Sequence, residues 1–112
     1  MIGIYDSFET QKHICFVMAL CSGGDLYSYI KKRRRIKEAT AKYFFKQILL
    51  GIESIHKAGV VHRDLKLENI MLDATGTIKI GDFGVSRRMK PNKRYFEQAG
   101  TPAYMAPEII GK

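Results

Sequence analysis

The chain has 112 residues, of which 46% are hydrophobic, and a formal net charge of +8 at pH 7; these values allow one modest domain with a core and exclude a disordered chain. Its apolar runs fall short of the roughly eighteen residues that a membrane span needs, and the first residues lack the basic stretch and apolar core of a signal peptide. We therefore expect a cytoplasmic protein, with the nucleus as the alternative, and no membrane partner.

The positive charge is concentrated in one segment. Five consecutive bases occupy residues 31–35, and Lys37 follows closely. Runs of this kind are most often solvated helix ends, and short basic patterns often match nuclear-import signals by chance. Aromatic residues of the kind that stack on nucleic-acid bases are not interleaved with the run. A nucleic-acid partner is therefore not expected.

The two cysteines, Cys15 and Cys21, are six residues apart. A second cysteine pair and partnering histidines are missing from the sequence, so it supports neither a zinc site nor a disulfide framework. We predict two reduced thiols packed within the domain.

The first elements predicted are a strand pair and a short helix. The apolar residues Ile2 and Ile4 and the run 14–18 predict two strands joined by a polar turn over residues 9–13. Residues 22–25 break this pattern and offer a helix start, after which apolar residues recur at helical spacing. The helix is expected to end among the basic residues.

The longest predicted helix runs from Glu38 to Ala58. Its apolar residues recur every three or four positions, and Gly59 follows as a stop. These apolar residues are Ala41, Phe44, Phe45, Ile48, Leu49, Ile52 and Ile55. This period is typical of a helix with one face on the core.

Two short strands, 70–72 and 77–80, are predicted around a tight turn at residues 73–76. From Gly81 to the end, the sequence has no sustained period and carries all three prolines. We therefore predict a long loop over residues 81–112, and loops of that length are usually functional or disordered.

Oxygen-bearing side chains gather around the loop His62–Asn69. Asp64 and Asn69 are five residues apart, and Asp82 follows across the predicted hairpin. Carboxylate and amide oxygens suit magnesium, which commonly binds one or two carboxylates together with substrate phosphates. Lys66 lies where an ammonium group would offset phosphate charge. The alternative, a set of turn-capping side chains, accounts poorly for this joint spacing.

Three ordered motifs carry a resemblance to a known family. They are His62-Arg63-Asp64, Asp82-Phe83-Gly84 and Ala106-Pro107-Glu108, with Asn69 at the matching offset. The chain resembles eukaryotic protein kinases along essentially its whole length. The resemblance implies an α+β fold, the central part of a kinase domain: residues 1–18 end the N-lobe sheet, 19–25 form the hinge, and 26–112 begin the mainly helical C-lobe, through its catalytic loop and activation segment to the third motif.

The resemblance also implies roles for the polar residues. Asp64 would orient the substrate hydroxyl and accept its proton, and Lys66 would face the transferring phosphate. Asn69 and Asp82 would hold the Mg²⁺ ions that bridge the phosphates of ATP. Because this transition state is loose, positioning and electrostatics would carry the catalysis.

Two features resemble the serine/threonine branch of the family. A lysine stands two residues after Asp64, and Gly100-Thr101-Pro102 precedes the third motif. The resemblance implies that Thr101 hydrogen-bonds near Asp64 and Lys66. The stretches 65–69 and 100–108 are similar to the calcium/calmodulin-dependent and AMP-activated groups, and also to others.

An adenine site is implied by the same alignment. Met18 would be the gatekeeper, backbone groups of Ala19 and Cys21 would bind the adenine edge, and Met71 would floor the pocket. Asp25 falls where the family places an acid near the ribose or a substrate arginine. Taken alone, the two methionines would more often be ordinary core residues.

The resemblance further suggests substrate and regulatory residues. Glu68 occupies a position that in some branches meets basic residues of the protein substrate, so Ser or Thr in a basic context is the expected target. Glu97 stands where many members carry a phosphorylated threonine, and its carboxylate would pair with Arg63. His62, Phe83 and Ile4 are expected to be structural, in a column that links the two lobes of the family.

Parts of the family pattern are missing from these residues. The Gly-rich loop, the strand lysine and its partner glutamate are not found, and losing even one preorganised donor costs on the order of a hundredfold in rate. Two hypotheses remain: a truncated serine/threonine kinase domain, or a noncatalytic, pseudokinase-like binding module. We expect the isolated 112 residues to be weakly active or inactive. Their oligomeric state is left open.

Overall fold

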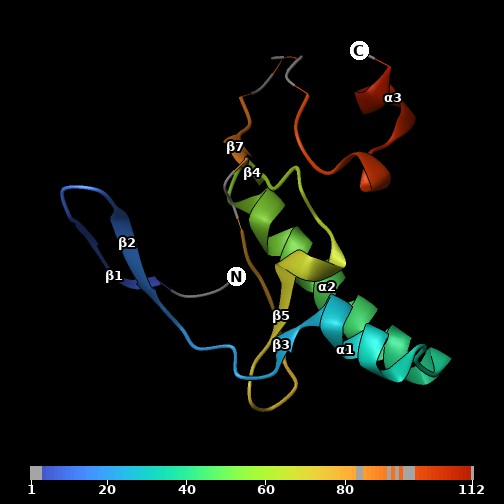
Figure 1. Ribbon diagram of the computed structural model, residues 1–112. Coiled ribbons are helices and arrows are strands. Elements are labelled where there is room, and N and C mark those ends of the chain that lie inside the picture. Colours follow the sequence, from blue (N-terminus) through green and yellow to red (C-terminus); the bar gives the residue numbers. More distant parts are fainter. Residues whose placement is uncertain (1–3, 83–84, 91, 93, 95–97, 112) are drawn as a thin grey trace.

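Short antiparallel strands and three α-helices make up the computed structural model, which describes residues 4–82, 85–90, 92, 94 and 98–111 (Figure 1). In chain order the elements, with η for 3₁₀ turns, are β1 (Ile4–Glu9), β2 (Ile14–Met18), β3 (Gly24–Asp25), α1 (Leu26–Arg33), α2 (Glu38–Lys57), β4 (Val60–Val61), η1 (Leu67–Asn69), β5 (Ile70–Leu72), β6 (Ile78–Ile80), β7 (Arg87–Arg88), η2 (Pro102–Tyr104) and α3 (Pro107–Ile110). Helices and small antiparallel sheets confirm the α+β class. In the described residues, none of the helices is long and apolar enough to cross a membrane.

The hairpin β1–β2 stands apart from the helices and joins them through an extended segment (Figure 1). Its antiparallel register runs from Ile4 opposite Met18 to Glu9 opposite Ile14. In the turn, the Thr10 hydroxyl accepts a hydrogen bond of 3.0 Å from the His13 amide. The predicted strand pair is confirmed from Ile4 onward, whereas Ile2 lies outside the described residues, and Glu9 belongs to the strand and not to the turn. The pairing of the two strands extends to Glu9 because the hydrogen bonds between Thr10 and His13 close the turn directly after it.

A three-stranded sheet in the order β3–β5–β6 lies against α1 and α2. The predicted strands at 70–72 and 77–80 form its hairpin, the second of them from Ile78. The side chain of Asp73 accepts hydrogen bonds from the backbone amides of Thr75 and Thr77 and so shapes the turn between them. The buried cluster where sheet and helices meet is Leu26, Phe44, Ile70, Leu72 and Ile78.

Helix α2 confirms the longest predicted helix, and it ends one residue earlier at Lys57. Phe44 and Ile55 are buried, as the helical period requires. Phe45 and Leu49 belong to the same period but remain 60% and 51% exposed. The apolar stripe is therefore wider than the core that covers it within the described residues.

The prediction of one long loop over residues 81–112 is wrong in part. Arg87 and Arg88 form β7, which pairs antiparallel with Val60 and Val61 of β4, and η2 and α3 follow. These strands have two residues each, too few for a periodicity to be visible. Their pairing ties residues 85–90 to the end of α2, as does the hydrogen bond from the Met89 amide to the Gly59 carbonyl. Both cysteines are free and half-buried, as predicted.

The first prediction concerns the cap of α1. The Asp25 carboxylate accepts hydrogen bonds from the Ser28 amide at 2.9 Å and the Ser28 hydroxyl at 2.7 Å, which lower the pKa of Asp25 below its usual 3.8. Asp25→Ala should cost about 1 kcal/mol of unfolding free energy in urea. Because the pKa is lowered on folding, this contribution is complete above the unfolded pKa and is lost as the pH falls through the folded one.

Asp25→Asn is the matched variant, since asparagine caps helices equally well and does not titrate. It should keep most of the stability near neutral pH and show a smaller loss of stability in acid than the parent chain. Equal acid sensitivity of the parent and of Asp25→Asn would contradict the assignment.

Candidate active site

Hydrogen bonds to the backbone of Gly81, the residue that follows β6, hold the loop from His62 to Asn69 in place. His62 is buried, and its Nε2 lies 2.7 Å from the Gly81 carbonyl while its Nδ1 accepts a hydrogen bond from the Asp64 amide. This pattern requires the hydrogen on Nε2. The Gly81 amide donates in turn to the Asn69 carbonyl at 2.8 Å. Asp64, Asn69 and Asp82 are thus held at one end of the β5–β6 hairpin.

Asn69 presents an oxygen while its nitrogen is anchored. The side chain is buried, and its Nδ2 donates to the Asp64 carbonyl at 2.8 Å. Its Oδ1 accepts no hydrogen bond from the described residues and remains available as a ligand. Asp82 holds an exposed carboxylate on a backbone with φ of 53°, a conformation unusual for residues other than glycine.

These two oxygen donors fit a hard cation such as Mg²⁺. Among the described residues, no three His, Cys, Asp or Glu side chains come together to hold a metal ion. A cation between Asn69 and Asp82 would therefore complete its coordination with water or with ligand oxygens, as magnesium commonly does.

Thr101 joins two candidate catalytic side chains of the loop, Lys66 and Asp64. Lys66 Nζ donates to the Thr101 hydroxyl at 2.7 Å, and that hydroxyl donates to Asp64 Oδ1 at 2.8 Å. The direct ion pair is longer, with 3.8 Å between Lys66 Nζ and Asp64 Oδ2. The side chains of Lys66 and Asp64 are only 20% and 16% exposed. This is the contact that the resemblance predicts for Thr101, and it spans 37 residues of sequence.

Gly100 brings Thr101 close to the loop. Its φ is +114°, and a Cβ built there would lie 2.7 Å from the Arg63 carbonyl oxygen. Arg63 itself has a positive φ of 71°, and its Nε donates to the Val85 carbonyl at 2.6 Å. Strained backbone of this kind concentrates at functional sites. Glu97, the predicted partner of Arg63, lies outside the described residues, as does Phe83.

The predicted adenine residues lie at the end of β2, on the segment that follows it, and on β5. Met18 is 52% exposed, whereas Met71 is half-buried and stands opposite Asp25 in the β3–β5 pairing. The Cys21 carbonyl accepts a hydrogen bond from the Gly24 amide. Within the part of the chain that the structure describes, the Cys21 N–H and the backbone of Ala19 make no hydrogen bond, so they can meet a ligand. The Asp25 carboxylate caps the start of α1 by accepting a hydrogen bond from the Ser28 amide.

The sequence assigned no role to two residues that contribute to the site, Tyr104 and Gly100. The Tyr104 hydroxyl donates to Glu68 Oε1 at 3.3 Å, and Gly100 permits the close approach described above. A hollow of about 330 Å³ opens beside Asp64 and Thr101, with Tyr104 and Met105 in its lining. A glycine directly before Thr101 was the only signal in the sequence for this packing.

Comparison with known proteins places the chain in a family. The family described as Protein kinase domain matches residues 1–112. NUAK family SNF1-like kinase 2 of Rattus norvegicus is 47% identical over 110 residues, and NUAK family SNF1-like kinase 1 of Homo sapiens is 46% identical over 110 residues. Serine/threonine-protein kinase ATG1a of Arabidopsis thaliana is 42% identical over 113 residues. Each alignment covers 98% of this chain but only 17–18% of the relative.

The second prediction tests the close approach at Gly100. Gly100→Ala should lower the unfolding free energy by about 2 kcal/mol or more, because it adds a clash with the Arg63 carbonyl to an unfavourable φ. Gly59→Ala is the control, since Gly59 has a φ of +76° with open space around its Cβ position. It should cost only roughly 1 kcal/mol. Urea unfolding measures both, and equal losses would contradict the clash.

Proposed function

The chain belongs to the protein kinase domain family, and we propose that it carries the site by which a serine/threonine protein kinase transfers the γ-phosphate of ATP to protein hydroxyl groups. The observation that carries this proposal is the bridge from Lys66 through Thr101 to Asp64. It holds an acceptor carboxylate and a phosphate-facing ammonium in one fixed arrangement. The names of the relatives support the same interpretation, because each is named a kinase and that of Arabidopsis thaliana a serine/threonine-protein kinase.

In the proposed mechanism, the two oxygens of Asp64 have separate tasks. Oδ1 accepts the Thr101 hydrogen bond and fixes the plane of the carboxylate. Oδ2 is left to orient the serine or threonine hydroxyl of the substrate and to accept its proton. The bond from that hydroxyl oxygen to the γ-phosphorus forms while the bond to the leaving ADP oxygen breaks.

Lys66 and the proposed metal ligands Asn69 and Asp82 would offset the negative charge of the ATP phosphates. One Nζ hydrogen of Lys66 goes to Thr101, and the two others can face the transferring phosphoryl group. Asn69 and Asp82 are the residues that would hold Mg²⁺. When bound, ATP supplies the phosphoryl group and Mg²⁺ offsets the charge of its phosphates. Since little covalent chemistry is left to the protein, the rigid backbone around His62 and Gly81 is its main contribution.

The finer division of the chain is part of the same proposal. Residues 1–18 would end the N-lobe, 19–25 would be the hinge, and 26–112 would begin the C-lobe. Adenine would lie against Met18 and Met71 and would bond to the backbone of Ala19 and Cys21. The separation of the β1–β2 hairpin from the helices supports this division (Figure 1). We place the protein in the cytoplasm, with the nucleus as the alternative.

The third prediction is that phosphate transfer depends on Asp64. The purified chain, given ATP labelled at the γ-phosphate, Mg²⁺ and a basic serine peptide, should transfer phosphate at a low rate. Asp64→Asn should lower that rate by about a hundredfold or more, because it removes the proton acceptor. Glu53→Gln makes the same chemical change at an exposed pair on α2 and should leave the rate unchanged.

The outcome also separates the two candidate functions. Transfer that survives Asp64→Asn would contradict the mechanism. A helical, folded sample without any transfer would favour the noncatalytic binding module for these residues.

The fourth prediction concerns substrate choice. The Glu68 carboxylate is exposed close to Asp64 and Lys66 in the loop, and Tyr104 holds one of its oxygens. We propose that it contacts a basic residue of the protein substrate. Glu68→Gln should weaken selection of arginine and lysine in a serine-peptide library by about tenfold, in KM rather than in kcat. Selection of acidic or proline-directed peptides by the parent chain would remove the proposal.

A further inference from the structure

The Thr101 hydroxyl lies where a phosphate acceptor would have to lie. Its hydrogen points to Asp64 Oδ1 at 2.8 Å, which is within reach of a general base, and its oxygen accepts a hydrogen bond from Lys66 Nζ at 2.7 Å. In the proposed function, Asp64 takes the proton of an attacking hydroxyl and Lys66 faces the transferring phosphoryl group. Thr101 therefore already touches both groups that act in the transfer.

The oxygen of Thr101 keeps a lone pair for attack on phosphorus. A hydroxyl oxygen has two lone pairs, and one of them accepts the Lys66 hydrogen. Within the described residues, no other donor is bonded to this oxygen. Lys66 and Asp64 on either side are partly exposed, so packing does not close off the remaining lone pair.

A hydroxyl beside a carboxylate is not rare in this chain. Ser28 donates to the carboxylate that caps α1, and Thr75 donates to the carboxylate in the β5–β6 turn. Neither of these carboxylates belongs to the loop His62–Asn69. The hydrogen bond that Lys66 donates to the hydroxyl oxygen distinguishes Thr101 from these two residues.

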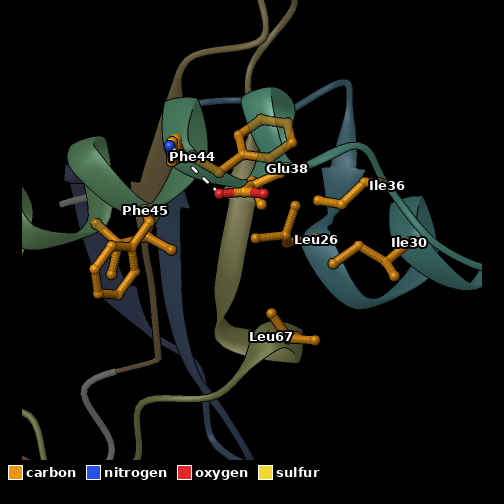
Figure 2. A pocket seen from close by; sticks show the side chains of 10 residues that line it. Leu26, Ile30, Ile36, Glu38, Phe44, Phe45 and Leu67 are labelled. Carbon is orange, nitrogen blue, oxygen red and sulfur yellow. Dashed lines mark ion pairs between the residues drawn. The ribbon is translucent and has the colours of Figure 1, made fainter.

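The backbone holds both sides of this contact in place. Gly100 lies so close to the Arg63 carbonyl that a Cβ would clash, and this contact fixes the approach of Thr101. On the other side, Leu67 follows Lys66 and packs against the buried cluster beneath α1 and α2. Figure 2 shows Leu67 with the other apolar side chains that line the space between these helices. The hydroxyl is therefore presented to the carboxylate in a fixed arrangement.

We propose that Thr101 is a phosphorylation site of the chain itself, and that its hydroxyl attacks the γ-phosphorus of bound ATP when a protein substrate is absent. The bond from Thr101 Oγ1 to phosphorus forms, and the bond from that phosphorus to the β,γ-bridging oxygen breaks, with its electron pair leaving on ADP. The hydroxyl proton goes to Asp64 Oδ1. This inference rests on the proposed function, because it uses the same carboxylate and the same ATP.

Transfer to Thr101 switches off the site that performs it. The phosphate carries about −1.5 to −2 charges at pH 7 and stands beside the Asp64 carboxylate, which has the same sign of charge. Its oxygens pair with Lys66, whose ammonium then no longer faces the phosphates of a second ATP. The distances of 2.7 and 2.8 Å leave room for one oxygen atom and not for a phosphoryl group, so the bridge opens. A protein substrate delays this step, since its hydroxyl consumes the same γ-phosphate.

The test incubates the purified chain with Mg²⁺ and ATP labelled at the γ-phosphate, with and without a basic serine peptide. Mass spectrometry of the digested chain locates the phosphate, and the rate is measured over a range of chain concentrations. Asp64→Asn removes the proton acceptor, and Glu53→Gln makes a comparable change at an exposed pair on α2. Thr101→Ser keeps a hydroxyl at the same position. All samples are first shown to be folded by circular dichroism.

Phosphate should appear on Thr101 before it appears on the exposed Thr10 and Thr75, with a rate constant independent of chain concentration, because donor site and acceptor belong to one chain. Asp64→Asn should lower this rate constant by about a hundredfold or more, and Glu53→Gln by less than about twofold. Thr101→Ser should still accept phosphate, and the peptide should slow the transfer to Thr101.

A second measurement does not depend on turnover. Phosphothreonine is built into the chain during synthesis in place of Thr101, or in place of Thr75 as the control, and both folded samples are titrated with a fluorescent ATP analogue. The phosphate at Thr101 should weaken binding by about tenfold relative to the phosphate at Thr75, because it occupies Lys66. Equal affinities would contradict the proposed loss of function on phosphorylation.

The outcomes separate this inference from the proposed function. Transfer to the peptide with none to Thr101 overturns the inference and leaves the proposed function standing. A rate constant that rises with chain concentration also overturns it, because transfer then occurs between chains. Equal labelling of Thr10, Thr75 and Thr101 overturns it as well, since the geometry at Asp64 then selects no acceptor. A folded sample that labels neither the peptide nor Thr101 removes both the inference and the proposed function for this chain.

Discussion

The Thr101 hydroxyl, placed between Lys66 and Asp64, is the contact on which the geometry of the candidate site depends. Without it, the ammonium and the carboxylate, which form an ion pair at 3.8 Å, would approach each other to hydrogen-bond distance. Thr101 accepts from one at 2.7 Å and donates to the other at 2.8 Å, so both charges stay near each other without neutralising fully. Partly buried, charge-assisted bonds of this kind are stronger than neutral ones. The bridge therefore fixes two side chains that flexible stems would leave variable.

This bridge requires strained backbone on both sides. Gly100 approaches the Arg63 carbonyl closely enough that a Cβ would clash, and Arg63 itself has a positive φ. Three neighbouring hydrogen bonds keep the backbone in this strained conformation. They join Arg63 Nε to the Val85 carbonyl, His62 Nε2 to the Gly81 carbonyl, and the Gly81 amide to the Asn69 carbonyl. Together they tie the loop, the end of β6 and residues 98–105 into one unit. Preorganisation of this unit is the physical basis of the proposed catalysis.

The sequence predicted those helices and strands that show as a pattern of apolar residues within one short segment. Helix α2 followed from its apolar period, and the β5–β6 hairpin from two apolar runs around a turn. The pairing of β4 with β7 could not be predicted, because it joins two-residue strands 28 positions apart between Val60 and Arg88. The exposure of Phe45 and Leu49 also escaped, since a period shows where apolar residues lie and not how far the core extends. At the candidate site, the types and the order of the residues were enough to propose roles for them. The strain at Arg63 and Gly100 and the Tyr104–Glu68 hydrogen bond could not be predicted, because they depend on contacts between segments far apart in the sequence.

A short 3₁₀ turn connects the core to the candidate active site. Leu67 packs against the buried cluster beneath α1 and α2 and directly follows Lys66, and the turn ends at Asn69, the proposed metal ligand. The turn is therefore held from two sides, by apolar packing at Leu67 and by the hydrogen bonds of Asn69 to Asp64 and Gly81. Because a packed core does not deform continuously, the positions of Lys66 and Asn69 are set by the core of the fold and not by the loop alone.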